Sequence, residues 1–248
     1  MAGSQTIIEI RQLSHLPEFS EVLRLQQVIW GFADVELLPL RFLVVLSKVG
    51  GHVFGAFDEE EMVGFCFAIP GIKPDGRPFL HSHMLGVLPA YHNCGIGRRL
   101  KLRQREDALA RGIGLMEWTF DPLELKNAFF NIERLGAIVR RYTLNQYGIT
   151  ASPLHGGLPT DRCVAEWWIE SPRVRAIVGG ESWPSHAAES ISYPADIAGI
   201  RSGQPGRALE IQKANAEKFQ SAFARGLAVT AFERRDNEGL YLLEPYPS

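Results

Sequence analysis

The chain has 248 residues, 46% of them hydrophobic, and a formal net charge of −2 at pH 7. Such a length suffices for one sizeable core, and the near-neutral charge gives no reason to expect nucleic acid or an anionic membrane as a partner. No apolar run reaches the roughly 18 residues of a membrane span, and the first residues lack the pattern of a signal peptide. Three widely spaced cysteines, Cys66, Cys94 and Cys163, indicate a reducing compartment rather than a disulfide framework. We therefore expect a cytoplasmic globular protein.

The N-terminal part predicts a strand, two helices and a hairpin. Residues 6–10 read as an opening strand, and apolar positions at helical spacing predict a helix over 17–30. A second helix is predicted from 38 or 39 to 49, where two glycines end it. The apolar segments 52–57 and 62–70, joined by an acidic turn, predict an antiparallel hairpin.

The rest of the chain is organised around residues 80–112. The pattern predicts a strand that ends at Pro89, a short turn, and a basic helix that starts at Gly95. Glycines let the backbone of such a turn approach a ligand and point its N–H groups inward, and the first turn of the helix adds unsatisfied donors. Such a place binds phosphate, and Arg98, Arg99 and Lys101 add positive charge nearby. An ordinary tight turn is the alternative.

A further strand and helix follow. In the strand LMEWTF, Met116, Trp118 and Phe120 lie on one face, and Glu117 and Thr119 lie on the other. The run 121–124 predicts a helix start with an aspartate N-cap, proline in the first turn and a glutamate three residues after the cap. This helix is predicted to stop at Gly136.

The last third of the chain predicts a strand pair and an appended piece. Residues 137–148 and 161–170 read as closing strands, joined by a long loop that contains His155. Residues 171–190 are rich in Ser, Gly and Pro and predict a linker. Residues 191–248 predict a strand, a helix from about 205 to 225 and a hairpin, a piece that is small for an independent core.

The spacing His92-x-x-Gly95-x-Gly97 resembles the pyrophosphate-binding motif of the GNAT superfamily of N-acyltransferases, Gln/Arg-x-x-Gly-x-Gly/Ala, except at its first position. The resemblance spans roughly residues 6–170, with specific motif similarity in 80–136. It implies an α/β (α+β) fold with a mixed central sheet flanked by helices. We expect a GNAT domain over 1–170, a linker over 171–190, and a β-α-β-β extension over 191–248 packed on the main domain.

The resemblance also implies acetyl-CoA or another acyl-CoA as co-substrate, with no metal. Gly86 is expected to mark a bulge in its strand, where the pantetheine arm would pair with the backbone; the alternative is that Gly86 makes room for a neighbour. Asn127 and Asn131, on the helix predicted to stop at Gly136, would flank the same arm, unless they are ordinary exposed asparagines. The predicted cofactor-binding residues are Leu85, Gly86, Val87, His92, Asn93, Cys94, Gly95, Ile96, Gly97, Arg98, Arg99, Asn127 and Asn131.

Acyl transfer to an amine requires positioning, an oxyanion donor and a base. The backbone N–H near Leu85 is the expected oxyanion donor. Glu117 ranks first as the base, with a structural ion pair as the alternative, and His83 and His81 follow. A tyrosine that protonates the thiolate in many family members aligns with Ile132 here, so Tyr142, or Tyr147, would have to substitute.

The leading function is therefore transfer of an acetyl or succinyl group to a small amine, with an amino acid as one option. Arg162 is the predicted holder of an acceptor carboxylate, with Arg140 and Arg141 as rivals and a plain surface ion pair as the alternative. A GNAT module that binds acyl-CoA without catalysis is the second reading. A nucleotide-phosphate site is the third, although neither common nucleotide-binding glycine motif is present. A homodimer is left open.

Overall fold

The computed structural model describes residues 7–32, 34–148 and 156–246. The chain divides into two compact units, an N-terminal unit over Met1–Met116 and a C-terminal unit over Glu117–Ser248. Among the described residues, no helix is long and apolar enough to cross a membrane. The domain limits expected from the sequence, at residues 170 and 190, stay a prediction.

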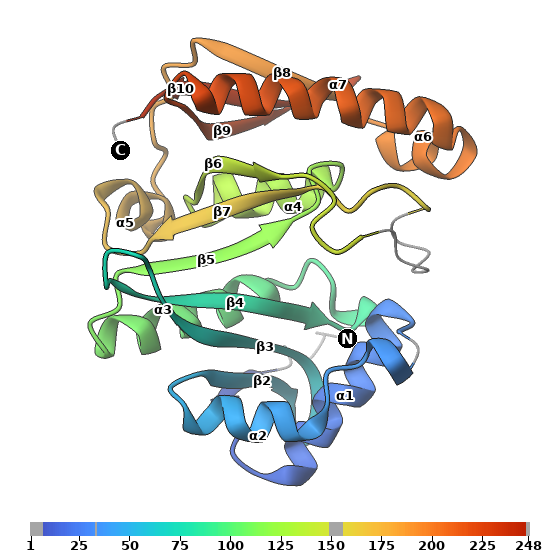
Figure 1. Ribbon diagram of the computed structural model, residues 1–248. Coiled ribbons are helices and arrows are strands. Elements are labelled where there is room, and N and C mark those ends of the chain that lie inside the picture. The colour runs from blue at the N-terminus through green and yellow to red at the C-terminus, as the bar shows by residue number, and fades with distance from the viewer. Residues whose placement is uncertain (1–6, 33, 149–155, 247–248) are drawn as a thin grey trace, which may run out of the picture. The chain divides into compact units, whose positions relative to one another are not determined.

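The N-terminal unit is a set of antiparallel strands in the order β1-β2-β3-β4, with helices on both faces (Figure 1). One apolar cluster joins Phe19 and Leu43 of the first two helices to one face, and a second joins Ile96 and Leu100 of the third helix to the other face. Its elements are β1 (Ile8–Gln12), α1 (Leu16–Trp30), the 3-10 turn η1 (Asp34–Glu36), α2 (Leu40–Lys48), β2 (His52–Asp58), β3 (Glu61–Ile72), β4 (Pro78–Val87), the 3-10 turn η2 (Pro89–Tyr91) and α3 (Ile96–Ala110).

The boundary between the two units falls within strand β5 (Leu115–Phe120), after Met116. In the C-terminal unit, the strand order continues from β5 as β7-β6-β9-β10-β8. Val139 of β6 pairs with Val229 of β9, which places the C-terminal hairpin beside β6. The further elements are α4 (Leu125–Phe129), the π-helical turn η3 (Phe130–Arg134), β6 (Ile138–Thr143), β7 (Arg162–Trp168), α5 (Pro172–Gly179), β8 (Glu189–Pro194), α6 (Ile197–Gly203), α7 (Pro205–Ala224), β9 (Leu227–Arg234) and β10 (Glu238–Pro245).

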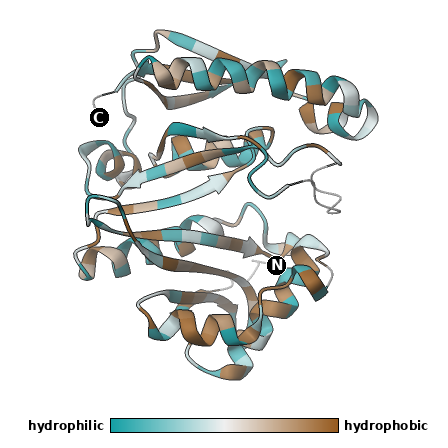
Figure 2. Ribbon diagram, viewed as in Figure 1, coloured by the Kyte–Doolittle hydropathy of each residue, from teal (hydrophilic) through white to brown (hydrophobic). Residues whose placement is uncertain are grey.

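Helix α7 covers strands of its own unit with one face. Hydrophobic and hydrophilic residues alternate along it (Figure 2), and its buried positions include Ala208, Ala216 and Phe219. Phe219 stacks on Tyr142 of β6 with ring centroids 5.3 Å apart and meets Tyr241 of β10 edge-on. The extension therefore shares a core with β6 and is not an appended tail.

Two helices were not predicted. Helix α5 lies where the sequence led us to expect an irregular linker, and its N-terminal Ser171 accepts a hydrogen bond from the N–H of Val174. Val174 and Ile177 of α5 are buried, so the segment belongs to the core. Helix α6 adds a short element to the predicted β-α-β-β extension.

Candidate functional site

The turn between β4 and α3 has the backbone shape that the glycine spacing predicts. Asn93 and Gly95 both adopt left-handed conformations, with φ of 63° and 77°. Gly95 is the N-cap of α3, and its carbonyl accepts the first intrahelical hydrogen bond, from the N–H of Arg99 at 3.1 Å. The N–H groups that precede Arg99 point out of the helix end, beside the positive end of the helix dipole. An anion can therefore bind there through backbone groups.

Side chains around this turn fix its shape. His92 donates from Nε2 to the carbonyl oxygen of Val87 at 3.0 Å, and Tyr91 donates its hydroxyl to Asp58 at 2.7 Å. Arg99 donates to the carbonyl oxygen of Ile8 at 2.6 Å, so its guanidinium ties α3 to β1. His92 and Arg99, both predicted to bind the cofactor, thus hold the turn with their side chains. Cys94 is an exposed free thiol.

The pairing of β4 with β3 decides which backbone groups of β4 are available. Leu88 donates to Val63 of β3 at 2.8 Å, and Gly86 is paired with Phe65. Because backbone groups alternate along a strand, those of Gly86 face β3, whereas those of Leu85 and Val87 face away from it. Of the three predicted positions, Leu85 and Val87 therefore direct backbone groups away from β3, although the Val87 carbonyl oxygen accepts from His92.

The bulge in β4 lies at His83 and not at Gly86, which corrects the prediction. Phe67 pairs with Met84 and Ala68 pairs with Ser82, so His83 is the extra residue. A Cβ atom at Gly86 would come within 2.8 Å of Ile29 and 2.9 Å of Trp30. Gly86 is thus required by close packing, the alternative that was weighed against the bulge.

His83 lies on the same face of β4 as His81, the face that packs on α1 and α2. Its ring lies 5.6 Å from the ring of Phe67 and 5.8 Å from that of His81. Burial lowers the pKa of His83, and burial, with the nearby positive groups, lowers the pKa of His81 to about 4. Both imidazoles are therefore neutral at pH 7.

On the other face of β4, a chain of hydrogen bonds runs through the interior. Lys101 donates to Ser82 at 2.8 Å, and Ser82 donates to Gln104 at 2.8 Å. The amide nitrogen of Gln104 donates to Nε2 of His52 at 3.1 Å, so Nδ1 of His52 carries the proton that it shares with Asp107 at 2.8 Å. Burial lowers the pKa of Lys101 to about 7 and lowers that of His52.

In the C-terminal unit, Glu117 lies in an ion-pair network. Met116, Trp118 and Phe120 are buried, and Glu117 lies on the opposite face, as predicted. Glu117 is 5% exposed, and its carboxylate accepts a hydrogen bond from Arg141. A bulge at Arg140 allows both Arg140 and Arg141 to reach Glu166 on β7. The structural ion pair weighed against catalysis is thus present.

Next along the same face of β5 is Thr119, whose hydroxyl lies 3.2 Å from the hydroxyl of the half-exposed Tyr147. The guanidinium of Arg162 lies 5.4 Å from the centre of the Tyr147 ring and donates to the carbonyl oxygen of Asp161 at 2.8 Å. Arg162 is only 8% exposed. The side chain of Arg162 thus supports the start of β7. The side chain of Arg141, its rival, is by contrast 48% exposed. His155 lies outside the described residues.

Comparison with known proteins assigns the family. Residues 16–136 match the Acetyltransferase (GNAT) family. Residues 16–136 thus form a region of the GNAT superfamily.

Several solved structures share this fold. They include the ribosomal-protein-S18-alanine N-acetyltransferase of Escherichia coli (16% identity, TM-score 0.52, 66% of this chain and 96% of that chain). NAA60 of Arabidopsis thaliana, solved with a bisubstrate analogue, is 13% identical (TM-score 0.54, 65% and 98%). A chain of the NatC complex, bound to Gag peptide and CoA, is 15% identical (TM-score 0.51, 64% and 96%). Among curated proteins, none matches this sequence. The predicted GNAT fold is confirmed.

The helix after β5 ends before Gly136 as predicted, but it begins later than predicted and its second half is a π-helical turn. Asp121 is not its N-cap: the Asp121 carboxylate accepts the N–H of Leu123 at 2.8 Å in a turn, and α4 begins at Leu125. The chain then widens into the π-helical turn η3, which changes the spacing of side chains. Asn127 is consequently exposed and Asn131 is buried.

Two tyrosines, Tyr142 and Tyr147, are candidates to replace the family tyrosine as proton donor. Ile132, at the position of the family tyrosine, is fully buried. Tyr142 donates its hydroxyl to Asp161 at 3.0 Å, and burial, with neighbouring negative groups, raises the pKa of Tyr142. The exposed hydroxyl of Tyr147 is therefore the better placed of the two.

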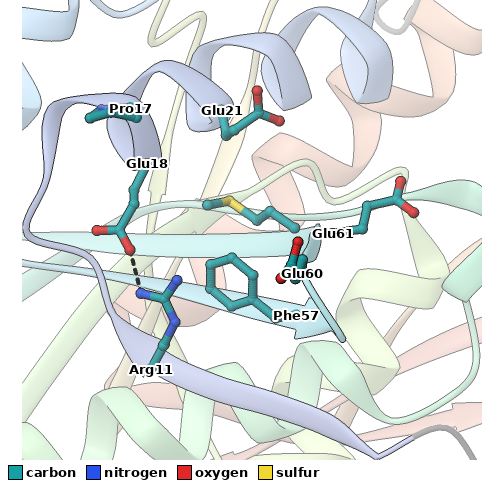
Figure 3. Close-up of a pocket in the computed structure, with 8 residues that line it drawn as sticks. Arg11, Pro17, Glu18, Glu21, Phe57, Glu60 and Glu61 are labelled. Atoms are coloured by element: carbon teal, nitrogen blue, oxygen red, sulfur yellow. Dashed lines mark hydrogen bonds and ion pairs between the residues drawn. The ribbon is translucent and has the colours of Figure 1, made fainter.

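A separate pocket of about 260 Å³ lies in the N-terminal unit between α1 and the β2–β3 turn (Figure 3). Glu18 points to Arg11 in an ion pair, and the Arg11 guanidinium lies 4.0 Å from the centre of the Phe57 ring. None of the predicted cofactor or catalytic residues lines this pocket. Among the described residues, no group of three His, Cys, Asp or Glu side chains could hold a metal ion.

Proposed function

We propose that this chain is a CoA-dependent N-acyltransferase that acylates a small amine by direct attack of the amine on the acyl thioester. The observation that carries the proposal is the β4–α3 turn. Asn93 and Gly95 turn the backbone towards the helix end, and Leu85 and Val87 of β4 present backbone groups on the side away from β3. A Cβ at Gly95 would meet nothing within 4 Å, so this side of the turn is open to a ligand.

Acyl-CoA supplies the activated acyl group when bound. The N–H groups from Asn93 to Arg98 would hold its pyrophosphate, and the backbone of Leu85 and Val87 would pair with its pantetheine arm. Either of these two N–H groups also suits an oxyanion, because a fixed backbone donor needs no reorganisation when negative charge develops on the carbonyl oxygen.

Removal of the amine proton falls to His83 in this proposal. An amine is mostly protonated at neutral pH and must lose a proton to attack. His83 is neutral because burial lowers its pKa, and it lies on the face opposite α3. Glu117, ranked first from the sequence, is bound to Arg141 and is therefore the weaker candidate. Tyr147 is proposed to return a proton to the thiolate.

The acceptor class that we propose is a small amine bearing a carboxylate, such as an amino acid. Arg141 presents a half-exposed guanidinium on the face of β5–β7 that also carries Glu117 and Thr119. Nη2 and Nε of Arg141 already donate to Glu117 and Glu166, so Nη1 is the group proposed to donate to an acceptor carboxylate. Acetyl and succinyl groups are both proposed as donors, and the free thiols Cys66 and Cys163 agree with action in the cytoplasm.

The test is thiol release from acetyl-CoA and succinyl-CoA with matched amines that do or do not carry a carboxylate. We expect release that depends on the amine and is faster with the carboxylate. Binding of CoA without any release would instead support the second candidate, an acyl-CoA-binding module without catalysis. That candidate is favoured by the ion-paired Glu117 and the buried Ile132. Absence of CoA binding would contradict both candidates.

A further inference from the structure

Helix α6 of the C-terminal extension sends one side chain into the turn that follows β5. Arg201 donates to Asp121 at 3.2 Å and to Glu124 at 2.6 Å. The side chain of Arg201 is only 12% exposed, and that of Asp121 is 17% exposed. One guanidinium thus bridges two carboxylates of the β5–α4 turn in a partly buried setting.

Asp121 depends on this arrangement. Burial raises its pKa, whereas the N–H of Leu123 and the positive charges of Arg162 and Arg201 act to lower it. A buried carboxylate that loses a charged partner is destabilised by far more than an exposed one. Arg201 is therefore one of the charged groups that favour the ionised form of Asp121 against its burial.

The same extension also contacts the residues that lead into β7. Gly156 lies on the aliphatic stem of Arg201, and a Cβ at Gly156 would come within 3.1 Å of Cγ of that arginine. Gln212 of α7 donates to the carbonyl oxygen of Pro159 at 2.8 Å, and Tyr241 of β10 donates to that of Pro122 at 2.7 Å. Figure 1 shows α6 at the same end of the C-terminal unit as the start of β7.

The two loops held by the extension are the β5–α4 turn and the residues that lead into β7. Both adjoin the polar groups at the end of β5. Thr160 binds the backbone N–H of Tyr147 at 2.9 Å, and Tyr147 in turn meets Thr119 and Arg162. A displacement of the 156–160 segment would therefore move Tyr147 relative to β5.

We propose that the extension is a positioning element for the acceptor end of the site, and that Arg201 is its central positioning residue. The role in acceptor selection rests on the function proposed above, whereas the anchoring of the two loops does not. Arg201 itself contacts no substrate in this proposal. It acts through the β5–α4 turn and the residues that lead into β7.

The experiment compares Arg201→Met, which keeps the stem under Gly156 and removes the guanidinium, with Arg225→Met as a matched control. Arg225 also lies in the extension and binds both oxygens of Glu189 at 2.6 Å, but it is exposed. Amide hydrogen exchange is measured over 121–131, 156–162 and β8–β10, together with CoA affinity and the KM of the acceptor.

In Arg201→Met, exchange in the two loops should accelerate about tenfold, as expected when hydrogen bonds to a charged group are lost. Acceptor KM should rise several-fold or more while CoA affinity is unchanged, and Arg201→Lys should restore part of both. Arg225→Met should change neither. Unchanged exchange in both loops, or faster exchange throughout β8–β10, would overturn the anchoring role.

Accelerated loops with an unchanged acceptor KM would overturn the role in acceptor selection. If the parent protein acylates no amine at all, the proposed function is contradicted, and loop-specific exchange would still support the anchoring. The two failures are therefore distinguishable.

Discussion

The β4–α3 turn and the polar face of β5–β7 are built from different parts of the chain. The turn is a backbone structure within a single stretch, and its defining feature is the positive φ of Asn93 and Gly95. The face is a side-chain structure in which Glu117, Arg141 and Glu166 meet from three strands. Backbone donors serve any anion of suitable size, whereas paired side chains select a particular partner.

The residues to which we assign roles belong to different units of the chain. The N-terminal unit supplies the candidate cofactor turn and the candidate base His83. The C-terminal unit supplies Arg141, proposed to bind the acceptor, and Tyr147, proposed to return a proton to the thiolate. Variants in the two units should therefore change different kinetic constants, and the predictions below test that separation.

The largest effect is expected for His83→Ala. Loss of a general base lowers turnover by about a hundredfold to ten-thousandfold, because the amine must then lose its proton to water. CoA affinity, measured by calorimetry, should stay within a factor of about two because His83 lies on the face opposite α3.

Glu117→Gln is the matched comparison for this prediction. Its carboxylate is held by Arg141, so the substitution should reduce activity much less than His83→Ala does. If Glu117→Gln lost more activity than His83→Ala, Glu117 on β5 would be the base. The proposed division of roles would then be wrong.

The second effect concerns Gly95. A β-branched residue disfavours the left-handed conformation with φ of 77°, so Gly95→Val should weaken CoA binding by about tenfold to a hundredfold. Gly95→Asn should be much milder, since asparagine adopts this conformation readily, as Asn93 already does two residues earlier. Equal affinity of the two variants for CoA, in folded protein, would contradict the backbone site.

The sequence predicted what depends on local pattern. The β2–β3 hairpin, α1, α3 and the two faces of β5 follow from apolar period and glycine stops, and all are present. The bulge was misplaced because Gly86 carries the usual signal, whereas the true site at His83 is set by register against β3. Nothing local distinguishes a glycine that forms a bulge from one that accommodates Ile29 and Trp30.

Contacts between distant segments were the part that could not be predicted. The motif at Asp121 has every local sign of an N-cap, yet Arg201, 80 residues later, binds that carboxylate, and α4 begins at Leu125. Helix α5 was missed because its proline, serine and glycine residues suggested a linker. In the structure, Ser171 and Pro172 begin the helix and Gly180 ends it.

The third effect concerns the buried Lys101 of the N-terminal unit. Its pKa is about 7 in the folded protein, below the value of about 10.4 for an exposed lysine. Between these values the unfolded chain binds more protons, so the stability contributed by this group rises with pH. The free energy of unfolding of the parent, relative to Lys101→Met, should rise by at most about 1.4 kcal/mol per pH unit from pH 7 to 10.

Urea unfolding of both proteins at several pH values measures this difference. Lys218→Met is the control, because Lys218 lies in the C-terminal unit and donates to Asn215 at a partly buried position. A flat difference for Lys101→Met would mean that Lys101 keeps an ordinary pKa despite its burial.

The smallest effect concerns the acceptor carboxylate and compares Arg141 with Arg162. The Arg141 side chain is 48% exposed, whereas Arg162 is 8% exposed and donates to the carbonyl oxygen of Asp161. Arg141→Gln should raise the KM of carboxylate-bearing amines about threefold to tenfold, since solvent screens part of such an ion pair. It should leave the KM of matched simple amines and the affinity for CoA unchanged.

Arg162→Gln should behave differently, because a buried guanidinium that supports the start of β7 contributes to stability. We expect a lower melting temperature and similar proportional losses for both kinds of amine. Steady-state kinetics with an amino acid and with its decarboxylated counterpart separates the two outcomes. A selective loss for the carboxylate-bearing amine in Arg162→Gln, and not in Arg141→Gln, would place acceptor recognition at Arg162. The face formed by Glu117, Arg141 and Glu166 would then be a structural ion-pair network.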